Sequence, residues 1–185
     1  MNINFDDYYM PAEWAAHEAT WLAYPVNAET WPADLDAVRD VYTQMIAALT
    51  PHEKVILLAA DGAVADLIHT RLTGSGVNFE NLKMVNIPVN DSWLRDAGPI
   101  FVKHRAADGQ PPLVAHDFVF NTWGKKYGPW DDDDQIPTRA GRLLGFPVVA
   151  HDMVLEGGSI DVNGSGSVLT TRQCLLNPNR NPSLT

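Results

Sequence analysis

Residues Lys54–Val89 read KVILLAADGAVADLIHTRLTGSGVNFENLKMVNIPV and give the clearest indication of the fold class. The stretch opens with Lys54–Ala59, a continuous apolar run typical of a strand buried on both faces. Asp61 then caps a predicted helix that ends at Leu72, whose inward positions recur every three or four residues: Val64, Leu67, Ile68 and Leu72. Lys83–Val89 returns as a second strand. A strand, a helix and a strand in this order predict an α/β or α+β protein.

The segment before this unit repeats the same alternation. Thr20–Tyr24 predicts a short strand, and Asp34–Thr50 predicts a helix with Asp34 as its N-cap and Pro51 as its stop. We expect one face of this helix to be buried, because seven apolar residues share it: Leu35, Val38, Val41, Tyr42, Met45, Ile46 and Leu49.

The second half of the chain is richer in strands and turns. One helix is predicted at Gln135–Leu144, directly after Asp131–Asp134, a run that we interpret as a solvated helix start because acidic residues favour helix N-termini. The predicted strands are Ile100–Lys103, Leu113–Phe120, Pro147–Val149, Ser159–Val162 and Ser167–Thr171. The sequence shows neither a domain boundary nor a fixed-period repeat.

Charge and composition narrow the possible partners. The 185 residues contain 13 Lys and Arg against 23 Asp and Glu, a net charge of −10. Such a surface repels phosphate backbones and anionic lipids, so we expect neither nucleic acid nor a membrane as partner, and a small cationic ligand suits it. The acidic, aromatic N-terminus excludes a secretory signal, and the expected location is the cytoplasm.

The cysteine and the six histidines predict no metal centre. Cys174 is the single cysteine, which excludes an internal disulfide and a cysteine-based zinc cluster. We expect it to be a buried, inert thiol in an apolar strand. The histidines lack the paired spacing of metal ligands and are predicted to be structural or solvent-facing.

Two acidic residues stand out at the ends of predicted strands. In Asn90–Pro99 (NDSWLRDAGP), Trp93 and Asp96 could share one helical turn. A carboxylate beside an aromatic ring is what recognition of a flat cation needs, because the carboxylate accepts hydrogen bonds in the plane and the ring covers the face. Alternatively, Asp96 could brace a loop. In Met153–Ile160 (MVLEGGSI), Glu156 precedes a diglycine that permits close backbone approach, and it must be paired, or it could lie at the edge of a β-bulge. A third segment, Phe120–Trp130, holds large aromatic residues that could line a pocket or cap the core.

Six segments in order resemble the agmatine deiminase family, grouped with the bacterial-type peptidylarginine deiminases. They are MPAEWAAHEATWLAYP, TWP, NDSWLRDAGPIFV, FNTWGKKYGPWDDD, VLEGGSIDVNG and TTRQCLLNPNRNP. The resemblance implies a pentein-type α/β propeller, a ring of ββαβ modules, and a cofactor-free reaction through a cysteine thiolate. It also implies that Asp96 and Glu156 are the carboxylates that hold the substrate guanidinium, and that Trp93 and Trp123 flank it.

The resemblance further implies that part of the catalytic machinery lies outside this sequence. Family members carry a His-x-Asp motif and a nucleophilic cysteine after the segment that corresponds to NPNRNP, and Cys174 matches a cysteine that is not the nucleophile. We therefore expect residues 1–185 to form the N-terminal half of one deiminase domain, an incomplete ring without activity alone. We expect agmatine to be the substrate in preference to peptidyl-arginine. A catalytically inactive guanidinium-binding module is the alternative function. The complete enzyme could be a homo-oligomer.

Overall fold

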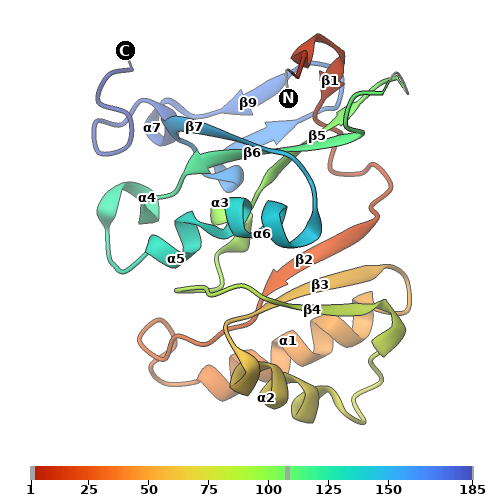
Figure 1. Ribbon diagram of the computed structural model, residues 1–185. Helices are drawn as coiled ribbons and strands as arrows, with labels where there is room; N and C mark the ends of the chain where they lie inside the picture. Colours follow the sequence, from red (N-terminus) through yellow and green to blue (C-terminus); the bar gives the residue numbers. More distant parts are fainter. Residues whose placement is uncertain (1–2, 107–108, 185) are drawn as a thin grey trace. The chain divides into compact units, whose positions relative to one another are not determined.

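The computed structural model describes residues 3–106 and 109–184, which divide into two compact units (Figure 1). The first, here called the three-stranded unit, comprises residues 16–94 and 131–133. The second, the four-stranded unit, comprises the described residues up to 15, 95–130 and from 134 onward. The assignment of both units to a single catalytic domain stays a prediction.

The three-stranded unit is a parallel sheet with helices in its crossover connections. Its strand order is β2-β3-β4, and Leu57 in the central strand pairs with Leu22 on one side and Met84 on the other. Its elements are β2 (Ala19–Ala23), α1 (Leu35–Leu49), β3 (Lys54–Ala59), α2 (Gly62–Leu72), η2 (Phe79–Asn81) and β4 (Leu82–Asn86). The predicted succession of strands and helices is confirmed, with β4 ending three residues earlier than expected.

The core of this unit forms where the apolar faces of β3, α1 and α2 meet. Leu57, Ile46, Ile68 and Leu72 are completely buried. Helix α2 begins as predicted, because Asp61 Oδ1 accepts a hydrogen bond from the Val64 amide at 2.9 Å. The N-cap side chain thereby satisfies one of the amides that a helix start leaves unpaired.

Helix α1 departs from prediction at its start and along one flank. The Asp34 side chain makes no capping hydrogen bond, although the helix begins where predicted. Val41 and Met45 were predicted to face inward, yet they are 53% and 39% exposed. They lie one turn apart on the same flank of α1. Both are exposed because the seven apolar positions form a stripe that is wider than the face covered by the sheet and α2.

The four-stranded unit is a mixed sheet with strand order β1-β5-β6-β7. The β1–β5 and β5–β6 pairs are antiparallel, and β6 pairs in parallel with β7 through the crossover helix α6, whose predicted position is confirmed. The strands and this helix are β1 (Tyr8–Tyr9), β5 (Ile100–His104), β6 (Leu113–Val119), α6 (Ile136–Leu144) and β7 (Val148–Val154). Two antiparallel strands and a helical crossover to a third form one ββαβ module.

The remaining elements of the described residues are short. They are η1 (Phe5–Asp7), α3 (Leu94–Ala97), α4 (Thr122–Lys125), α5 (Asp131–Asp134), η3 (Gly157–Ser159), β8 (Ile160–Val162), β9 (Val168–Thr170) and α7 (Arg172–Leu175). Strand β9 is exposed along its length, with Val168 and Leu169 60% and 72% exposed. The prediction for Cys174 was wrong, because the residue lies in α7 and is half-buried. The Thr171 hydroxyl accepts a hydrogen bond from the Cys174 amide and so caps the start of a helix. The apolar residues around Cys174 had indicated a strand there.

The helices of the described residues are short. The longest, α1, has 15 residues. At about 1.5 Å per residue such a helix spans less than the hydrocarbon core of a bilayer, which is about 30 Å thick. Within residues 3–106 and 109–184 no helix combines the length and the apolar character that crossing a membrane requires.

The acidic run Asp131–Asp134 is not a solvated helix start, which corrects the prediction. Asp133 is only 2% exposed, and its Oδ1 accepts the amides of Asn90 at 2.8 Å and Asp91 at 3.3 Å. The Asn90 side chain in turn accepts the amides of Asp132 and Asp133. Burial is the main cause that raises the pKa of Asp133 to about 6, and the charges of Asp91 and Asp132 raise it further. The hydrogen bonds from the amides of Asn90 and Asp91 lower the pKa and offset part of this rise. Asp133 faces inward because its carboxylate accepts the backbone amides of a distant loop, whereas Asp131 is exposed.

Asp133 makes the stability of the chain depend on pH in a defined direction. Its folded pKa lies above the ordinary value, so the folded state holds more protons than the unfolded state between about pH 4 and pH 6. This group therefore adds stability as the pH falls through 6. We expect Asp133→Asn to lose that gain, on the order of 1–2 kcal/mol between pH 7 and pH 4.5, in urea unfolding. Asp131→Asn, at an exposed position, is the control, and equal pH slopes for wild type and Asp133→Asn would contradict the prediction.

Candidate functional site

Glu156 lies at the point where strand β7 has ended and the chain turns. Its side chain is 2% exposed. Two residues earlier, Val154 is held by Asn181, which accepts the Val154 amide and donates to its carbonyl, both at 2.9 Å. After Glu156 the chain closes into η3, where the Ser159 amide and hydroxyl both donate to the Glu156 carbonyl. The backbone on both sides of Glu156 is therefore fixed.

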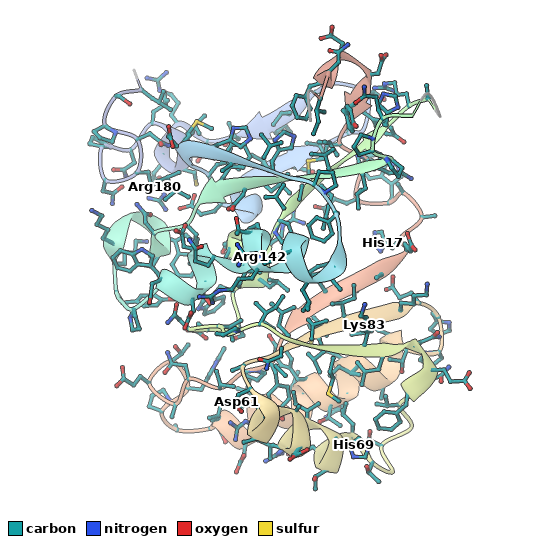
Figure 2. The ribbon with its side chains drawn as sticks, viewed as in Figure 1. His17, Asp61, His69, Lys83, Arg142 and Arg180 are labelled. Carbon is teal, nitrogen blue, oxygen red and sulfur yellow. The ribbon has the colours of Figure 1, made fainter. Side chains whose placement is uncertain are left out.

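The Glu156 carboxylate is paired with an arginine from the end of the chain. Arg180 Nε donates to Glu156 Oε1 at 2.8 Å, and the two side chains are 8% and 2% exposed. Figure 2 labels Arg180 in the segment beside the strands of this unit. The prediction that a glutamate in this position must be paired is confirmed, since an unpaired buried carboxylate is costly.

Asp96 lies in α3 and both of its carboxylate oxygens accept hydrogen bonds. Oδ1 accepts the Gly158 amide at 3.0 Å, and Oδ2 accepts the indole N–H of Trp123 at 3.2 Å. The diglycine permits this contact, because a Cβ on Gly158 would lie 2.2 Å from Asp96 Oδ1 and one on Gly157 would lie 2.4 Å from the carbonyl oxygen of Arg95. The diglycine backbone thus approaches Asp96, and its predicted approach to a ligand stays a prediction.

Asp96 and Glu156 are near enough to affect each other's charge. Burial is the main reason that the pKa of Asp96 is raised, and the negative charge of Glu156 raises it further. The hydrogen bonds from Gly158 and Trp123 and the charge of Arg95 act in the opposite direction. Two acidic residues 60 positions apart in the sequence therefore meet in the four-stranded unit. A pair of partly desolvated carboxylates can accept hydrogen bonds from a cation, and that Asp96 and Glu156 bind one stays a prediction.

Trp123 is presented by a strained turn. Thr122 and Trp123 have φ of 50° and 56°, in the left-handed region that β-branched and bulky residues avoid. Asn121 caps the turn by accepting the Gly124 amide at 2.8 Å, and the Thr122 hydroxyl donates to the Tyr127 carbonyl at 2.6 Å. Strain of this kind persists where surrounding contacts enforce it, and here it directs the indole of Trp123 at Asp96.

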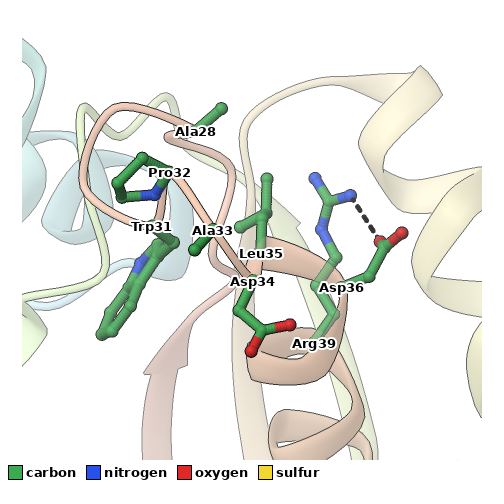
Figure 3. Close-up of a pocket in the computed structure, with 8 residues that line it drawn as sticks. All are labelled: Ala28, Trp31, Pro32, Ala33, Asp34, Leu35, Asp36 and Arg39. Atoms are coloured by element: carbon green, nitrogen blue, oxygen red, sulfur yellow. Dashed lines mark hydrogen bonds and ion pairs between the residues drawn. The ribbon is translucent and has the colours of Figure 1, made fainter.

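Trp93 belongs to the three-stranded unit, where it has its own partners. Its indole N–H donates to Asp91 Oδ2 at 3.0 Å, and its ring lies 6.1 Å from that of Trp31. Trp31 lines a pocket beside the start of α1, and its indole nitrogen is buried with no hydrogen-bond partner among the described residues (Figure 3). The lining residues are Ala28, Trp31, Pro32, Ala33, Asp34, Leu35, Asp36 and Arg39. That Trp93 shares a site with Asp96 stays a prediction.

The sequence prediction for the histidines missed one pair. His116 Nδ1 and His151 Nε2 lie 2.7 Å apart, and Phe118 stacks on His151 with ring centres 4.3 Å apart. Burial, followed by His151, lowers the pKa of His116. The two come from β6 and β7, and only the register of this parallel pair, in which His116 opposes Val149, could have predicted the contact. In the described part of the chain no three His, Cys, Asp or Glu side chains gather as metal ligands would.

Comparison with known proteins decides the family. Residues 9–185 match the family described as Porphyromonas-type peptidyl-arginine deiminase. The chain belongs to this family. The agmatine deiminase of Medicago truncatula is 36% identical over 188 residues, which cover 97% of this chain and 48% of the plant protein.

Solved structures confirm the fold that the resemblance implied. The agmatine deiminase of Enterococcus faecalis matches with a TM-score of 0.85 and 29% identity, over 97% of this chain and 48% of that one. An agmatine deiminase of C. jejuni, described with substrate bound, matches with a TM-score of 0.82 and 28% identity, over 100% of this chain and 52% of that one. This member of the peptidyl-arginine deiminase family therefore has the pentein-type fold in part, and it spans about half the length of the curated relatives it matches.

The close packing of the diglycine on Asp96 predicts the effect of a small substitution. In Gly158→Ala the new methyl group would overlap Asp96 Oδ1, so the carboxylate must move away from Trp123. We expect a loss of about 1–3 kcal/mol in the free energy of unfolding and a shift of the Trp123 indole N–H signal in NMR spectra. Gly62→Ala is the matched control, because nothing lies within 4 Å of its added methyl group. An unmoved indole signal in Gly158→Ala would contradict the geometry.

Proposed function

We propose that this chain is the guanidinium-binding half of an agmatine deiminase, which converts agmatine and water to N-carbamoylputrescine and ammonia. The observation that carries the proposal is the meeting of Asp96 and Glu156 in one unit. The names of the relatives and of the solved structures support agmatine as the substrate. The family's hydrolysis of C–N bonds gives the reaction class.

The two carboxylates suit a planar cation. A guanidinium carries its N–H donors in one plane, and carboxylates can accept them in pairs while aromatic rings cover its faces. Asp96 and Glu156 would accept those donors, and Trp123, already hydrogen-bonded to Asp96, would lie at the edge of the bound group. Trp93 would cover a face. The same negative charges stabilise the positive charge that the reaction intermediate retains.

The chemical step needs groups that this sequence does not supply. In the proposed reaction a cysteine thiolate attacks the guanidinium carbon, and ammonia leaves with a proton to give a covalent thiouronium. Water activated by a histidine then adds to the same carbon, the urea product leaves, and the thiolate is restored. We assign both groups to the rest of the protein. Cys174 is half-buried in α7, and we give it no role in the reaction.

Peptidyl-arginine is the second candidate substrate, favoured by the description of the matching family. A peptide that ends in arginine carries a carboxylate, and recognising it calls for an arginine on the enzyme. The segment Ala106–Thr138, which follows the Asp96 segment, contains no arginine, and Lys125 and Lys126 are its only basic residues besides His116. Agmatine has no carboxylate and therefore fits this segment better.

Location and assembly complete the proposal. We place the protein in the cytoplasm, which the single cysteine of this sequence supports. The complete enzyme is proposed to form homo-oligomers. The substrate is a small cation, which a net charge of −10 attracts.

The isolated chain is expected to release no ammonia from agmatine, because the thiolate and histidine are assigned to the rest of the protein. The measurement is coupled ammonia detection with purified residues 1–185 and with Cys174→Ala. Ammonia release that survives Cys174→Ala would show that residues 1–185 act without a cysteine, which contradicts the assignment of the nucleophilic cysteine to the rest of the protein. Release that Cys174→Ala abolishes would show that Cys174 was wrongly excluded.

Calorimetry tests the inactive-module alternative, which predicts stoichiometric agmatine binding that Asp96→Ala removes.

A competition assay on the complete protein separates the two substrates. With agmatine and an arginine-terminated peptide present together, we expect kcat/KM for agmatine to exceed that for the peptide by about tenfold or more, since the segment Ala106–Thr138 contains no arginine to bind the carboxylate of the peptide. Free arginine serves as the control for the carboxylate alone. A preference for the peptide would assign the protein to peptidyl-arginine instead.

A further inference from the structure

Arg180 lies against a residue of the proposed substrate clamp. It contacts Glu156 from within the same unit, and nothing in the family resemblance assigned it a role. We propose that Arg180 is a positioning residue that holds the Glu156 carboxylate through a charge-assisted hydrogen bond, turned so that one oxygen stays available to a substrate guanidinium. The part concerning substrate rests on the proposed function.

The contact geometry leaves half of the carboxylate unused. Arg180 donates through Nε to Oε1 at 2.8 Å, a single bond from the side of the guanidinium. Its terminal NH1 donates to Asn179 Oδ1 at 3.4 Å, away from the carboxylate. The hydrogen bonds of the described residues give Glu156 Oε2 no donor. A carboxylate oxygen has room for further donors, so a ligand can bind Glu156 without displacing Arg180.

The loop that carries Arg180 is fixed to the strand that carries Glu156. Asn177 starts the loop, and its carbonyl accepts the amides of Arg180 and Asn181 at 2.9 and 3.0 Å. Asn181 is 5% exposed, and its side chain binds both backbone groups of Val154 and the carbonyl of Leu175. These bonds set the distance between Arg180 and the end of β7. The arginine therefore cannot move away freely when a substrate arrives.

Gly124 brings the strained turn against the same loop. A Cβ on Gly124 would lie 2.3 Å from the Asn179 side chain, so only glycine fits there. Asn121 Nδ2 also donates to the Asn179 carbonyl at 3.4 Å. The turn that directs Trp123 at Asp96 and the loop that directs Arg180 at Glu156 thus pack on each other. Both carboxylates are positioned by one connected set of contacts.

The charges explain why a fixed cation is needed. Glu156 is almost fully buried and has the carboxylate of Asp96 near it, so burying the two negative groups without a cation would be costly. Arg180 supplies a permanent positive charge at 2.8 Å from Glu156 Oε1. Asp96, Glu156 and Arg180 together carry one net negative charge, which one substrate guanidinium neutralises.

The contrary interpretation is that Arg180 imitates the substrate and blocks the site. A blocking arginine would occupy both carboxylate oxygens and would sit on a segment free to leave. Arg180 uses one oxygen and is held by a bonded loop. The two interpretations predict opposite effects of its removal on agmatine use.

The first experiment measures the ionisation of Glu156 in the 185-residue chain without substrate. The chain is labelled with ¹³C at glutamate side chains, and the Glu156 signal is followed against pH in wild type, Arg180→Ala and Arg180→Lys. We expect the titration midpoint to move up by about one pH unit or more in Arg180→Ala and by less in Arg180→Lys, which keeps the charge but not the Nε contact. Arg172→Ala, at an exposed arginine of α7, is the matched control.

A merely structural role for Arg180 would lower stability and leave this midpoint in place, and that result overturns the proposal. If Arg180→Ala does not fold, Arg180→Lys decides alone, and an unchanged midpoint in it is the contrary result. The midpoint does not depend on any substrate, so it tests the positioning role separately from the proposed function.

The second experiment measures agmatine hydrolysis by the complete protein. We expect kcat/KM to fall about tenfold or more in Arg180→Ala, with partial recovery in Arg180→Lys and none of the loss in Arg172→Ala. Higher activity in Arg180→Ala would support the blocking interpretation and overturn the positioning role. If the Glu156 midpoint moves in Arg180→Ala but the complete wild-type protein does not hydrolyse agmatine, the positioning role is supported and the proposed function is overturned.

Discussion

Two carboxylates that repel each other are kept together largely out of water, and the local structure of the four-stranded unit serves that requirement. Glu156 is neutralised by Arg180, and Asp96 is held by the Gly158 amide and the indole of Trp123. Each support comes from a different segment of the chain. The diglycine, the strained turn before Tyr127 and the Asn177–Asn181 loop are all explained by this single constraint.

The repeating elements could be predicted from the sequence because they depend on local patterns. The apolar run of β3, the Asp61 cap of α2 and the position of α6 all follow from residues within one turn or one strand. The six collinear segments also predicted the family, and the family match over residues 9–185 confirms it. Prediction failed where burial depends on a neighbouring element, as at Val41 and Met45 on α1.

The supports of the site could not be predicted in the same way. The sequence indicated that Glu156 must be paired, but the partner Arg180 is 24 residues away, and no spacing rule connects them. The acidic run around Asp133 indicated a surface position, but the Asp133 carboxylate accepts the amides of Asn90 and Asp91, which lie about 40 residues earlier in the sequence. The His116–His151 pair likewise depends on the register of two strands. Contacts of this kind are set by tertiary packing, which local periodicity does not encode.

Asp96 and Glu156 are proposed to bind the same substrate guanidinium. The most direct measurement is a crystal structure of the complete protein with agmatine bound. We predict that the guanidinium nitrogens lie within hydrogen-bond distance of a carboxylate oxygen of each residue, with Glu156 Oε1 still bound to Arg180. Agmatine bound elsewhere, or contacting only one of the two carboxylates, would contradict the claim.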